Sequence, residues 1–359
     1  MSARIIAAKR SAVVPRGGAF ARCSIEDLGT PVIAALLADA GIAPGAVDEV
    51  ICANALGAGG NPARRLALAA GMGHVAGLTI DRQCAGGLDA VLLAQAMVIS
   101  GAARVVIAGG VESYSRRPLR LRTDPGGGPA VAYDQPAFTP WPGRDPDMAE
   151  AAQTLAARLG ISRAAQDALA VASHARAMAA DMSAEIVPIA GQSRDAFARN
   201  LTPALAARAS VITSGITAAN AAVAADAAAF VLVVDAKIAH SRGLQIVAGA
   251  SLGTDPTEPG LAPVPAIARA LAAAGIGQGD LAVIEMMEAY AAQAIACMQR
   301  AGLDPARTNL SGGALARGHP IGASGAILAV RLFYQLQRGY GLAAIAAAGG
   351  VGSALVVRR

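Results

Sequence analysis

A segment of fifteen residues occurs twice in this chain, and the repeat limits the folds that the chain can adopt. Residues 31–45 (PVIAALLADAGIAPG) and 265–279 (PAIARALAAAGIGQG) align without a gap, and nine of the fifteen positions are identical. Each copy is typical of an amphipathic helix that ends at a glycine, and an apolar strand follows, at residues 47–52 and 281–286. The chain therefore contains two related helix–strand units.

A second match follows the first in the same order. Residues 108–113 (AGGVES) resemble residues 348–353 (AGGVGS), and each segment follows a short apolar strand, at 105–108 and 344–347. Two matches in one order and at nearly one offset rarely arise by chance, even in an alanine-rich chain. We therefore predict an α/β fold made of two duplicated, layered halves in which helices and buried strands alternate.

The middle of the chain differs from both repeats. Residues 116–145 are rich in Pro, Gly and Arg with little periodicity, which is typical of an irregular insertion. Helical patterns follow at about 148–159 and 163–181, and an apolar strand at 227–234 returns the chain to a core. We predict a first half of residues 1–115 plus 216–236, an inserted loop domain of residues 116–215, and a second half of residues 237–359.

Composition restricts the partners of the protein. Of 359 residues, 54% are hydrophobic but only 3% aromatic, so Ala, Val, Leu and Ile must fill the cores. The formal net charge is +5, but nearly all basic residues are Arg, which can reflect the base composition of a genome, so we expect no nucleic-acid partner. The local cluster at 116–122 (RRPLRLR) could contact an anionic ligand such as a nucleotide phosphate, or form a solvated face.

Cysteine usage and hydropathy bear on the compartment. The four cysteines are scattered and form no CxxC pair, which argues against a zinc site or a disulfide framework and fits a reducing compartment. The start of the chain lacks the long apolar segment of a secretory signal. The uncharged stretch 339–357 contains five glycines, so we expect buried strands there rather than a membrane span. We expect a cytoplasmic protein with no membrane contact and no metal.

Cys84 lies in residues 81–91 (DRQCAGGLDAV), where a thiol precedes two glycines and an apolar run with helical spacing begins at Leu88. If that run is a helix, Cys84 lies in its first turn, where free N–H groups and the positive dipole end favour a thiolate. The glycines would let a substrate carbonyl approach closely. The segment predicts a covalent nucleophile, and a small buried hydrophobic residue is the alternative.

The repeat supplies a partner for this thiol. It maps the Cys84 loop onto residues 318–325 (GHPIGASG), so each half offers a glycine-rich turn before a helix, one with a thiol and one with an imidazole. If pseudo-twofold symmetry brings the turns together, His319 can accept the proton of Cys84. We therefore predict a catalytic pair, and a structural His before a Pro is the alternative.

These motifs resemble those of the thiolase superfamily. The matches comprise NPAR at 61–64, RQCA at 82–85, GGVES at 109–113, DALAVASHARA at 167–177, TAAN at 217–220, EAYAAQ at 288–293 and NLSGGALARGHPIGASG at 309–325. The resemblance implies two αβαβα-layered halves and a loop domain that holds coenzyme A. It implies that an acyl-CoA, as substrate rather than bound cofactor, acylates Cys84 with help from His319. It also implies a homodimer or a dimer of dimers.

The chain departs from the thiolase pattern where Claisen chemistry needs an acid/base group and an enolate donor. In thiolases a Cys in a Cys-x-Gly-Gly-Gly context moves the proton, but here residues 346–350 read AAAGG, so Ala346 takes its place. The Asn of an Asn-Glu-Ala-Phe motif, which helps to hold a water at the enolate, is Met287, and a thioether donates no hydrogen bond.

Smaller departures affect the expected coenzyme A contacts. Ala222 replaces a Ser that typically touches the pantetheine, and Asp147-Met148 replaces the common His-Met. The residues that we expect to contact the substrate are Met148, Ala222, Met287, Gly349 and Gly350.

Three functions remain open. The first is a thiolase (acetyl-CoA acetyltransferase or 3-ketoacyl-CoA thiolase) with a substitute base, for which Glu288 is nearest by motif; for Glu288 and Glu112, a buried structural role is the alternative. The second is an acyltransferase or thioester hydrolase without Claisen chemistry, and the third is a non-catalytic coenzyme A-binding partner subunit. We favour a CoA-thioester acyltransferase in which Cys84 carries the acyl group and His319 activates it.

Overall fold

The computed structural model describes residues 2–359, and most of their strands form one mixed sheet. The strands of this sheet are β1 (Ala3–Ser11), β2 (Val14–Pro15), β3 (Glu49–Ala53), β4 (Leu78–Ile80), β5 (Val105–Glu112), β8 (Ile186–Val187), β11 (Ala225–Asp235), β12 (Leu244–Gly253), β13 (Leu281–Met286), β14 (Tyr340–Ala347) and β15 (Val351–Arg358). Their order is β13-β14-β15-β12-β1-β11-β5-β3-β4, with β2 beside β11 and β8 beside β1.

The pairing of these strands repeats the same pattern twice. In the first half, β3 runs parallel to β5, β5 antiparallel to β11, and β11 antiparallel to β1. In the second half, β13 runs parallel to β14, β14 antiparallel to β15, and β15 antiparallel to β12. The halves join through a short antiparallel contact of β1 with β12, where Arg4 pairs with Gln245. The predicted duplicated α/β fold is therefore confirmed.

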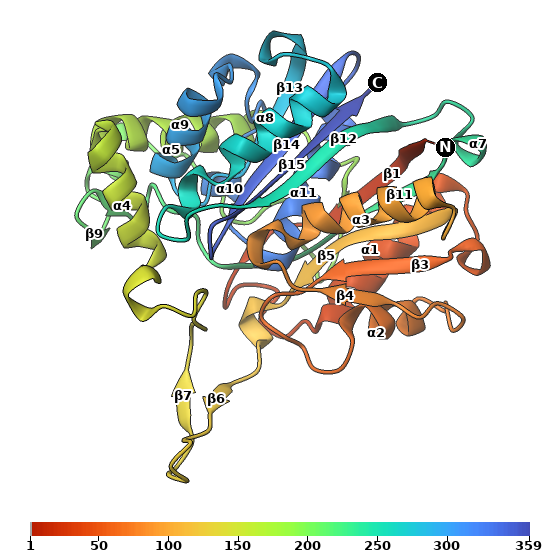
Figure 1. The fold of residues 1–359 in the computed structure, drawn as a ribbon, viewed down its shortest axis with the longest axis horizontal. Coiled ribbons are helices and arrows are strands. Elements are labelled where there is room, and N and C mark those ends of the chain that lie inside the picture. The colour runs from red at the N-terminus through yellow and green to blue at the C-terminus, as the bar shows by residue number, and fades with distance from the viewer. Residues whose placement is uncertain (1) are drawn as a thin grey trace.

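The two halves of the sheet and three layers of helices stack in five layers (Figure 1). On the outside, α1 (Ile25–Ala40) packs on β1 and β11, and its repeat partner α8 (Pro263–Ala274) packs on β12 and β15. Both end at a glycine with positive φ, Gly41 and Gly275, as the repeat predicted. In the central layer, α3 (Gly86–Ser100) packs against α11 (Ile321–Gln335), and apolar side chains from both halves of the sheet close around this pair.

The segment inserted in the first half, between β5 and β11, forms a projection and a small helical group. Residues 116–145 leave the body as a hairpin of β6 (Arg120–Arg122) and β7 (Val131–Tyr133) (Figure 1). The chain then returns through α4 (Met148–Leu159), whose first turn is capped by Asp147. The remaining elements are α2 (Pro62–Ala69), α5 (Arg163–Ala179), α6 (Pro203–Ala207), α7 (Ala236–Ala239), α9 (Ala291–Ala301), α10 (Ala314–Arg317), β9 (Val211–Thr213) and β10 (Ile216–Thr217).

One helical stretch, Gln83–Ser100, is long and apolar enough to cross a membrane by those two criteria alone. It comprises α3 and the turn before it. Half of its residues are buried, and α3 packs against α11 and β5 in the central layer. These contacts are those of a core helix.

Candidate active site

Cys84 lies in a single helical turn, Gln83–Ala85, that leads directly into α3. Gln83 has φ 48°, a left-handed conformation that is unusual for a residue with a side chain. The carboxylate of Asp81 holds this turn, because it accepts hydrogen bonds from the backbone N–H of Gln83 at 2.8 Å and from its side-chain amide at 3.1 Å. Backbone strain next to a reactive side chain is common at functional sites. No sequence motif indicated the left-handed conformation of Gln83.

His319 lies just before α11, and the structure brings it to Cys84. Its backbone N–H donates to Val223 O at 2.7 Å, which ties the turn to the segment before β11. The Nε2 atom is 3.0 Å from Cys84 Sγ, and Nδ1 is 2.7 Å from Ser324 Oγ. The two side chains that the repeat paired across the halves are therefore in hydrogen-bonding contact.

Ser324 determines which nitrogen of His319 carries the proton. The Ser324 hydroxyl donates its single hydrogen to Pro320 O at 3.1 Å. Its oxygen must then accept from Nδ1–H, which leaves the lone pair of Nε2 directed at the thiol. Sequence reasoning missed this role, although the spacing of five residues, across the Pro and into the first helical turn, could have indicated it.

Burial keeps the pair neutral in the free protein. Burial raises the pKa of Cys84 to about 12, and it lowers the pKa of His319 to about 4. Hydrogen bonds from the backbone N–H groups of Cys84 and Ala348 lower the pKa of the thiol, but burial outweighs them. The pKa shift of Cys84 is opposite to the one expected at the start of a helix. The loss of water around the sulfur destabilises the thiolate more than the backbone N–H groups and the helix dipole stabilise it.

A cavity of about 320 Å³ opens beside the pair. Of the five expected substrate contacts, Met148 and Ala222 line it, and Met287, Gly349 and Gly350 are not among its lining residues. Met287 is instead buried in the central core. Ala346, Ala347 and Ala348 line the cavity, so methyl groups occupy the wall where the thiolase pattern has a thiol.

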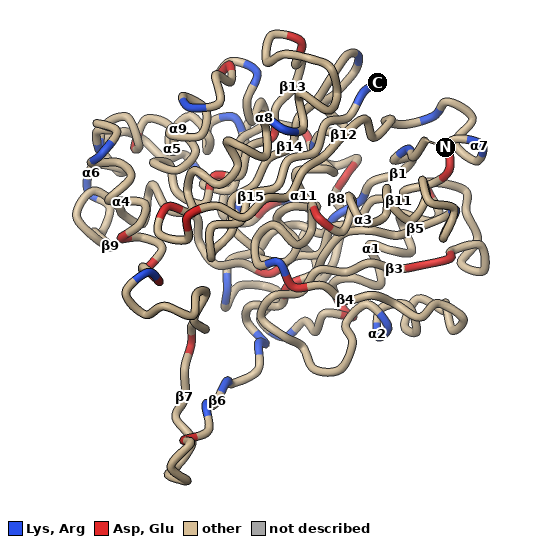
Figure 2. Tube along the Cα trace, in the orientation of Figure 1, with Lys and Arg blue, Asp and Glu red and all other residues tan. Residues whose placement is uncertain are grey.

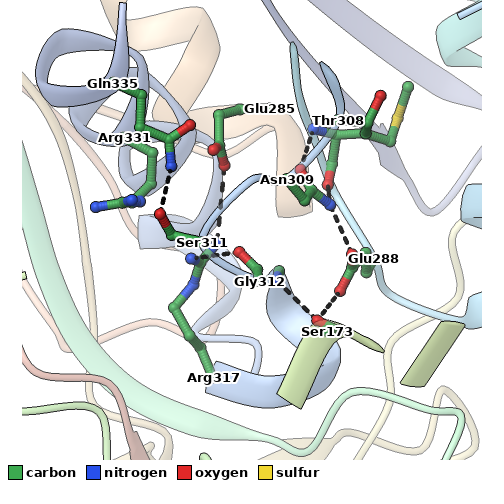
Figure 3. A network of polar contacts seen from close by, with 12 residues as sticks. Ser173, Glu285, Glu288, Thr308, Asn309, Ser311, Gly312, Arg317, Arg331 and Gln335 are labelled. Atoms are coloured by element: carbon green, nitrogen blue, oxygen red, sulfur yellow. Dashed lines mark hydrogen bonds and ion pairs between the residues drawn. The ribbon is translucent and has the colours of Figure 1, made fainter. Parts of the chain in front are cut away.

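Glu288 lies away from this cavity, in a buried polar network (Figure 3). Its side chain accepts hydrogen bonds from Ser173 Oγ at 2.8 Å, from Asn309 Nδ2 at 2.6 Å and from the backbone N–H of Leu315 at 3.3 Å. In the same network, Arg317 lies 3.9 Å from Glu285. The structure does not bring Glu288 to Cys84, and its contacts are those of a fully paired structural carboxylate.

Glu112 links the two halves at the base of the site. Its carboxylate accepts from Asn54 Nδ2 at 2.8 Å and from the backbone N–H groups of Ala55 at 3.0 Å and Gly322 at 2.9 Å. Burial raises its pKa to about 7. Because Gly322 belongs to the first turn of α11, Glu112 holds the end of β5 against the turn that carries His319.

The projecting segment supplies one wall of the cavity and a group of positive charges. Arg120, Asp134 and Phe138 line the cavity, and Arg120 Nη2 donates to Leu56 O at 2.9 Å. Figure 2 shows basic residues along the stem of the hairpin near β6. Arg117 pairs with Asp134 and stacks 4.7 Å from the ring of Tyr114. Of the arginines in the cluster at 116–122, Arg120 lines the cavity, whereas Arg116 and Arg122 are exposed.

In the part of the chain that the structure describes, no group of three or more His, Cys, Asp or Glu side chains is placed to hold a metal ion. The groups that lie next to the reactive sulfur in the cavity are an imidazole and backbone N–H groups. Such a set suits covalent acyl transfer.

This chain matches known proteins along nearly its whole length. Family models of the thiolase N-terminal domain and the thiolase C-terminal domain match residues 3–237 and 242–359. The chain is 38% identical over 400 residues to the acetyl-CoA acetyltransferase of Thiocystis violacea, covering 99% of this chain and 98% of that protein. It is also 38% identical over 392 residues to the acetyl-CoA acetyltransferase of Cupriavidus necator, with the same coverage. The crystal structure of the Bacillus anthracis acetyl-CoA acetyltransferase matches with a TM-score of 0.92 at 31% identity, covering 99% of this chain and 98% of that one. The chain belongs to the thiolase family.

Proposed function

We propose that this protein is an acyltransferase that carries an acyl group from a coenzyme A thioester on Cys84. The observation that carries the proposal is the 3.0 Å contact between Cys84 Sγ and Nε2 of His319. As sulfur attacks the thioester carbonyl, its proton moves to Nε2, and the departing coenzyme A thiolate takes that proton as it leaves. The backbone N–H groups of Cys84 and Ala348, which lie at the sulfur, are placed to stabilise the negative oxygen of the tetrahedral intermediate.

The acceptor of the acyl group is the second part of the proposal. Transfer to an acceptor that needs no α-proton removal fits the cavity best, because Ala346 cannot move a proton and Met287 is buried in the core. Thiolytic cleavage or Claisen condensation is the second candidate, and the names of the acetyl-CoA acetyltransferases at 38% identity favour it. Glu288 as a substitute base would require that it leave three hydrogen bonds. The intact Cys84–His319 pair speaks against a purely non-catalytic subunit.

We propose that acyl-CoA is the substrate, with no permanently bound cofactor, and that the protein forms a homodimer or a dimer of dimers in the cytoplasm. The projecting hairpin supports an assembly, because Leu119 is 94% exposed and Leu121 and Val131 are also exposed there. The four cysteines form no disulfide, which fits a reducing compartment. Light scattering on the purified protein measures the number of copies.

One experiment tests the acyl-transfer proposal. The protein is incubated with a panel of acyl-CoAs that differ in chain length, and its intact mass is measured with Cys84→Ser as the control. The expected result is an acyl adduct on the wild type that is absent from Cys84→Ser and formed more slowly in His319→Ala. Absence of any adduct would exclude both enzymatic functions, and an adduct without cleavage of acetoacetyl-CoA would exclude the thiolase alternative.

A further inference from the structure

Arg120 brings a positive charge to the wall of the Cys84 cavity. Among residues 2–359, it is the one Lys or Arg that lines this cavity, and Asp134 and Asp147 are the acidic residues of the lining. Arg120 belongs to β6, at the stem of the hairpin where Figure 2 shows basic residues. A charged group on the wall of a cavity lined mainly by apolar residues can fix the orientation of a ligand.

Backbone carbonyl groups hold the guanidinium of Arg120 in place. Its Nη2 donates to Leu56 O at 2.9 Å and to Ala55 O at 3.2 Å, and its Nη1 donates to Asp134 O at 3.3 Å. Within residues 2–359, the Nε–H group of Arg120 donates to no acceptor of the protein. The guanidinium is therefore fixed in orientation and still has a donor for a ligand.

The contacts of Leu56 join Arg120 to the base of the reacting pair. The N–H group of Leu56 donates to Glu112 at 3.3 Å, and the same carboxylate accepts from Gly322 N–H at 2.9 Å. Gly322 is three residues beyond His319 and belongs to the first turn of α11. Arg120 is therefore attached to the part of the site that carries the imidazole.

The charge of Arg120 has no carboxylate partner of its own. In the described part of the chain, no ion pair includes Arg120, and Asp134 pairs with Arg117 instead. The hydrogen bond from Arg117 lowers the pKa of Asp134, and the charges of Arg117, Arg16 and Arg120 lower it further. Arg16 also acts on the carboxylate of Asp226. Three arginines thus act on two carboxylates, which leaves an excess of positive charge at this wall.

An anion that reaches Arg120 from inside the cavity must belong to the acyl group. The cavity of about 320 Å³ has room for an acyl group and the end of the pantetheine arm, but not for the nucleotide of coenzyme A. With the thioester carbonyl at Cys84, the whole pantetheine arm separates the phosphates from this cavity. Tyr114 and Gln135 also line the cavity, but they are uncharged, so they do not select a carboxylate over a neutral polar group as an arginine does.

We propose that Arg120 binds a carboxylate at the far end of the acyl group, so that the cavity selects coenzyme A thioesters of dicarboxylic acids over those of simple fatty acids. The thioester carbonyl lies at Cys84 and the carboxylate lies at Arg120, where charge-assisted hydrogen bonds hold it. No bond of the carboxylate forms or breaks. The inference rests on the proposed binding of acyl-CoA at Cys84.

The test measures the binding of matched thioesters to the Cys84→Ala protein, which cannot be acylated. Each pair has equal carbon number: succinyl-CoA with butyryl-CoA, glutaryl-CoA with pentanoyl-CoA, and adipyl-CoA with hexanoyl-CoA. Calorimetry gives the dissociation constants for this protein with and without Arg120→Gln. The protein with Arg120 should bind at least one dicarboxylic thioester more tightly than its neutral counterpart. Loss of the charge-assisted hydrogen bonds should reduce that preference by about tenfold.

Arg122→Gln is the matched control, because it removes an exposed arginine of the same strand that does not line the cavity. It should leave the preference unchanged. A change of less than twofold in Arg120→Gln for every pair would overturn the proposal. If Arg120→Gln fails to fold, the protein with Arg120 still decides, because the absence of any preference for a dicarboxylic thioester would overturn the proposal as well.

The phosphates of coenzyme A are the other anions that an arginine can bind. Glutaryl-pantetheine and pentanoyl-pantetheine lack these phosphates, and we expect their affinities to show the same dependence on Arg120. If Arg120→Gln weakens both members of each coenzyme A pair equally and leaves the pantetheine pair unchanged, Arg120 binds a phosphate and the proposal is wrong. Failure of the acyl-transfer proposal has a different signature, namely no adduct on Cys84 in the wild type, whereas the binding preference is measured on Cys84→Ala.

Discussion

Gly325 of α11 lies directly against Leu88 of α3, so that a Cβ atom at Gly325 would be only 2.4 Å from the backbone nitrogen of Leu88. This contact holds the two central helices close together. Because Cys84 precedes one helix and His319 precedes the other, the separation of the helices also sets the distance between thiol and imidazole.

Gly325→Ala should therefore lower both stability and reactivity. The added methyl group must push the helices apart or strain them, which costs about 1–3 kcal/mol in free energy of unfolding. Urea denaturation measures this loss, and acylation of Cys84 should slow in parallel. Gly45→Ala is the matched control, because a Cβ there meets no atom within 4 Å, and it should change stability by no more than about 0.5 kcal/mol. Equal stability of the two variants would contradict the close packing.

Ser324→Ala should reduce acylation of Cys84 without unfolding the protein. Removing the hydroxyl leaves Nδ1–H of His319 without its acceptor, so the imidazole loses its fixed tautomer and orientation. We expect the acylation rate to fall by about tenfold, a fraction of what a general base contributes. Stopped-flow or quenched mass measurements give the rate. Ser311→Ala, which removes a hydroxyl that accepts only from Gln335, is the control. Identical acylation rates in the two variants would show that Ser324 does not position His319.

The reactivity of Cys84 toward iodoacetamide should rise with pH through the whole range from 7 to 10. A pKa raised to about 12 leaves the thiol protonated throughout this range, so the thiolate fraction grows about tenfold with each pH unit. Peptide mass mapping separates Cys84 from the other cysteines. A rate that levels off near pH 6–7 would instead indicate a stable thiolate–imidazolium pair.

The rate of enzymatic acylation should be limited at low pH by protonation of His319. The pKa of His319 is lowered to about 4, so the imidazole remains neutral, and able to accept a proton, down to about pH 5. The acylation rate should therefore be retained between pH 8 and about pH 5 and fall below that. A fall centred near pH 6.5 would contradict the burial of His319.

Ala346→Cys should restore proton transfer at the α-carbon of an acyl-CoA. Ala346 lines the cavity beside the thiol, so the added sulfur has space to enter it. We expect deuterium exchange into the methyl group of acetyl-CoA to increase by at least about tenfold, because general acid–base groups contribute factors of this size or larger. Nuclear magnetic resonance follows the exchange. Ala346→Ser, which is similar in size but a much weaker acid, should stay at the level of the parent protein. If deuterium exchange with Ala346→Cys also stays at the level of the parent protein, residue 346 does not face the α-carbon.

The fold could be predicted well wherever local pattern and repeat agree. The helix expected at 148–159 forms over those residues, and the strand expected at 281–286 is β13. The strand expected over 105–108 instead continues through Gly109 and Gly110 to Glu112. A Cβ at these positions would lie 2.1 Å from Ala229 O and 2.0 Å from Gly322 O. These glycines therefore permit close packing against the neighbouring strand β11 and against the first turn of α11, and local sequence cannot distinguish such glycines from those of a turn.

From the sequence, only the residue types of the site and the pairing of Cys84 with His319 could be predicted. The repeat paired Cys84 with His319 because the two loops occupy equivalent positions in the halves. The direction of the Cys84 pKa shift could not be predicted, since it depends on how completely the surrounding chain excludes water. The location of Glu288 could not be predicted either, because its partners Ser173 and Asn309 come from segments far from it in sequence.

The division of the reacting pair between two duplicated halves has an evolutionary consequence. A single half carries either the nucleophile or the base, so neither half in its present form could transfer an acyl group as a pair of identical copies. Fusion of the copies into one chain let each loop specialise independently. A substitution in one half, such as alanine where the family pattern has a second thiol, can then remove one step of the chemistry while leaving the other step intact.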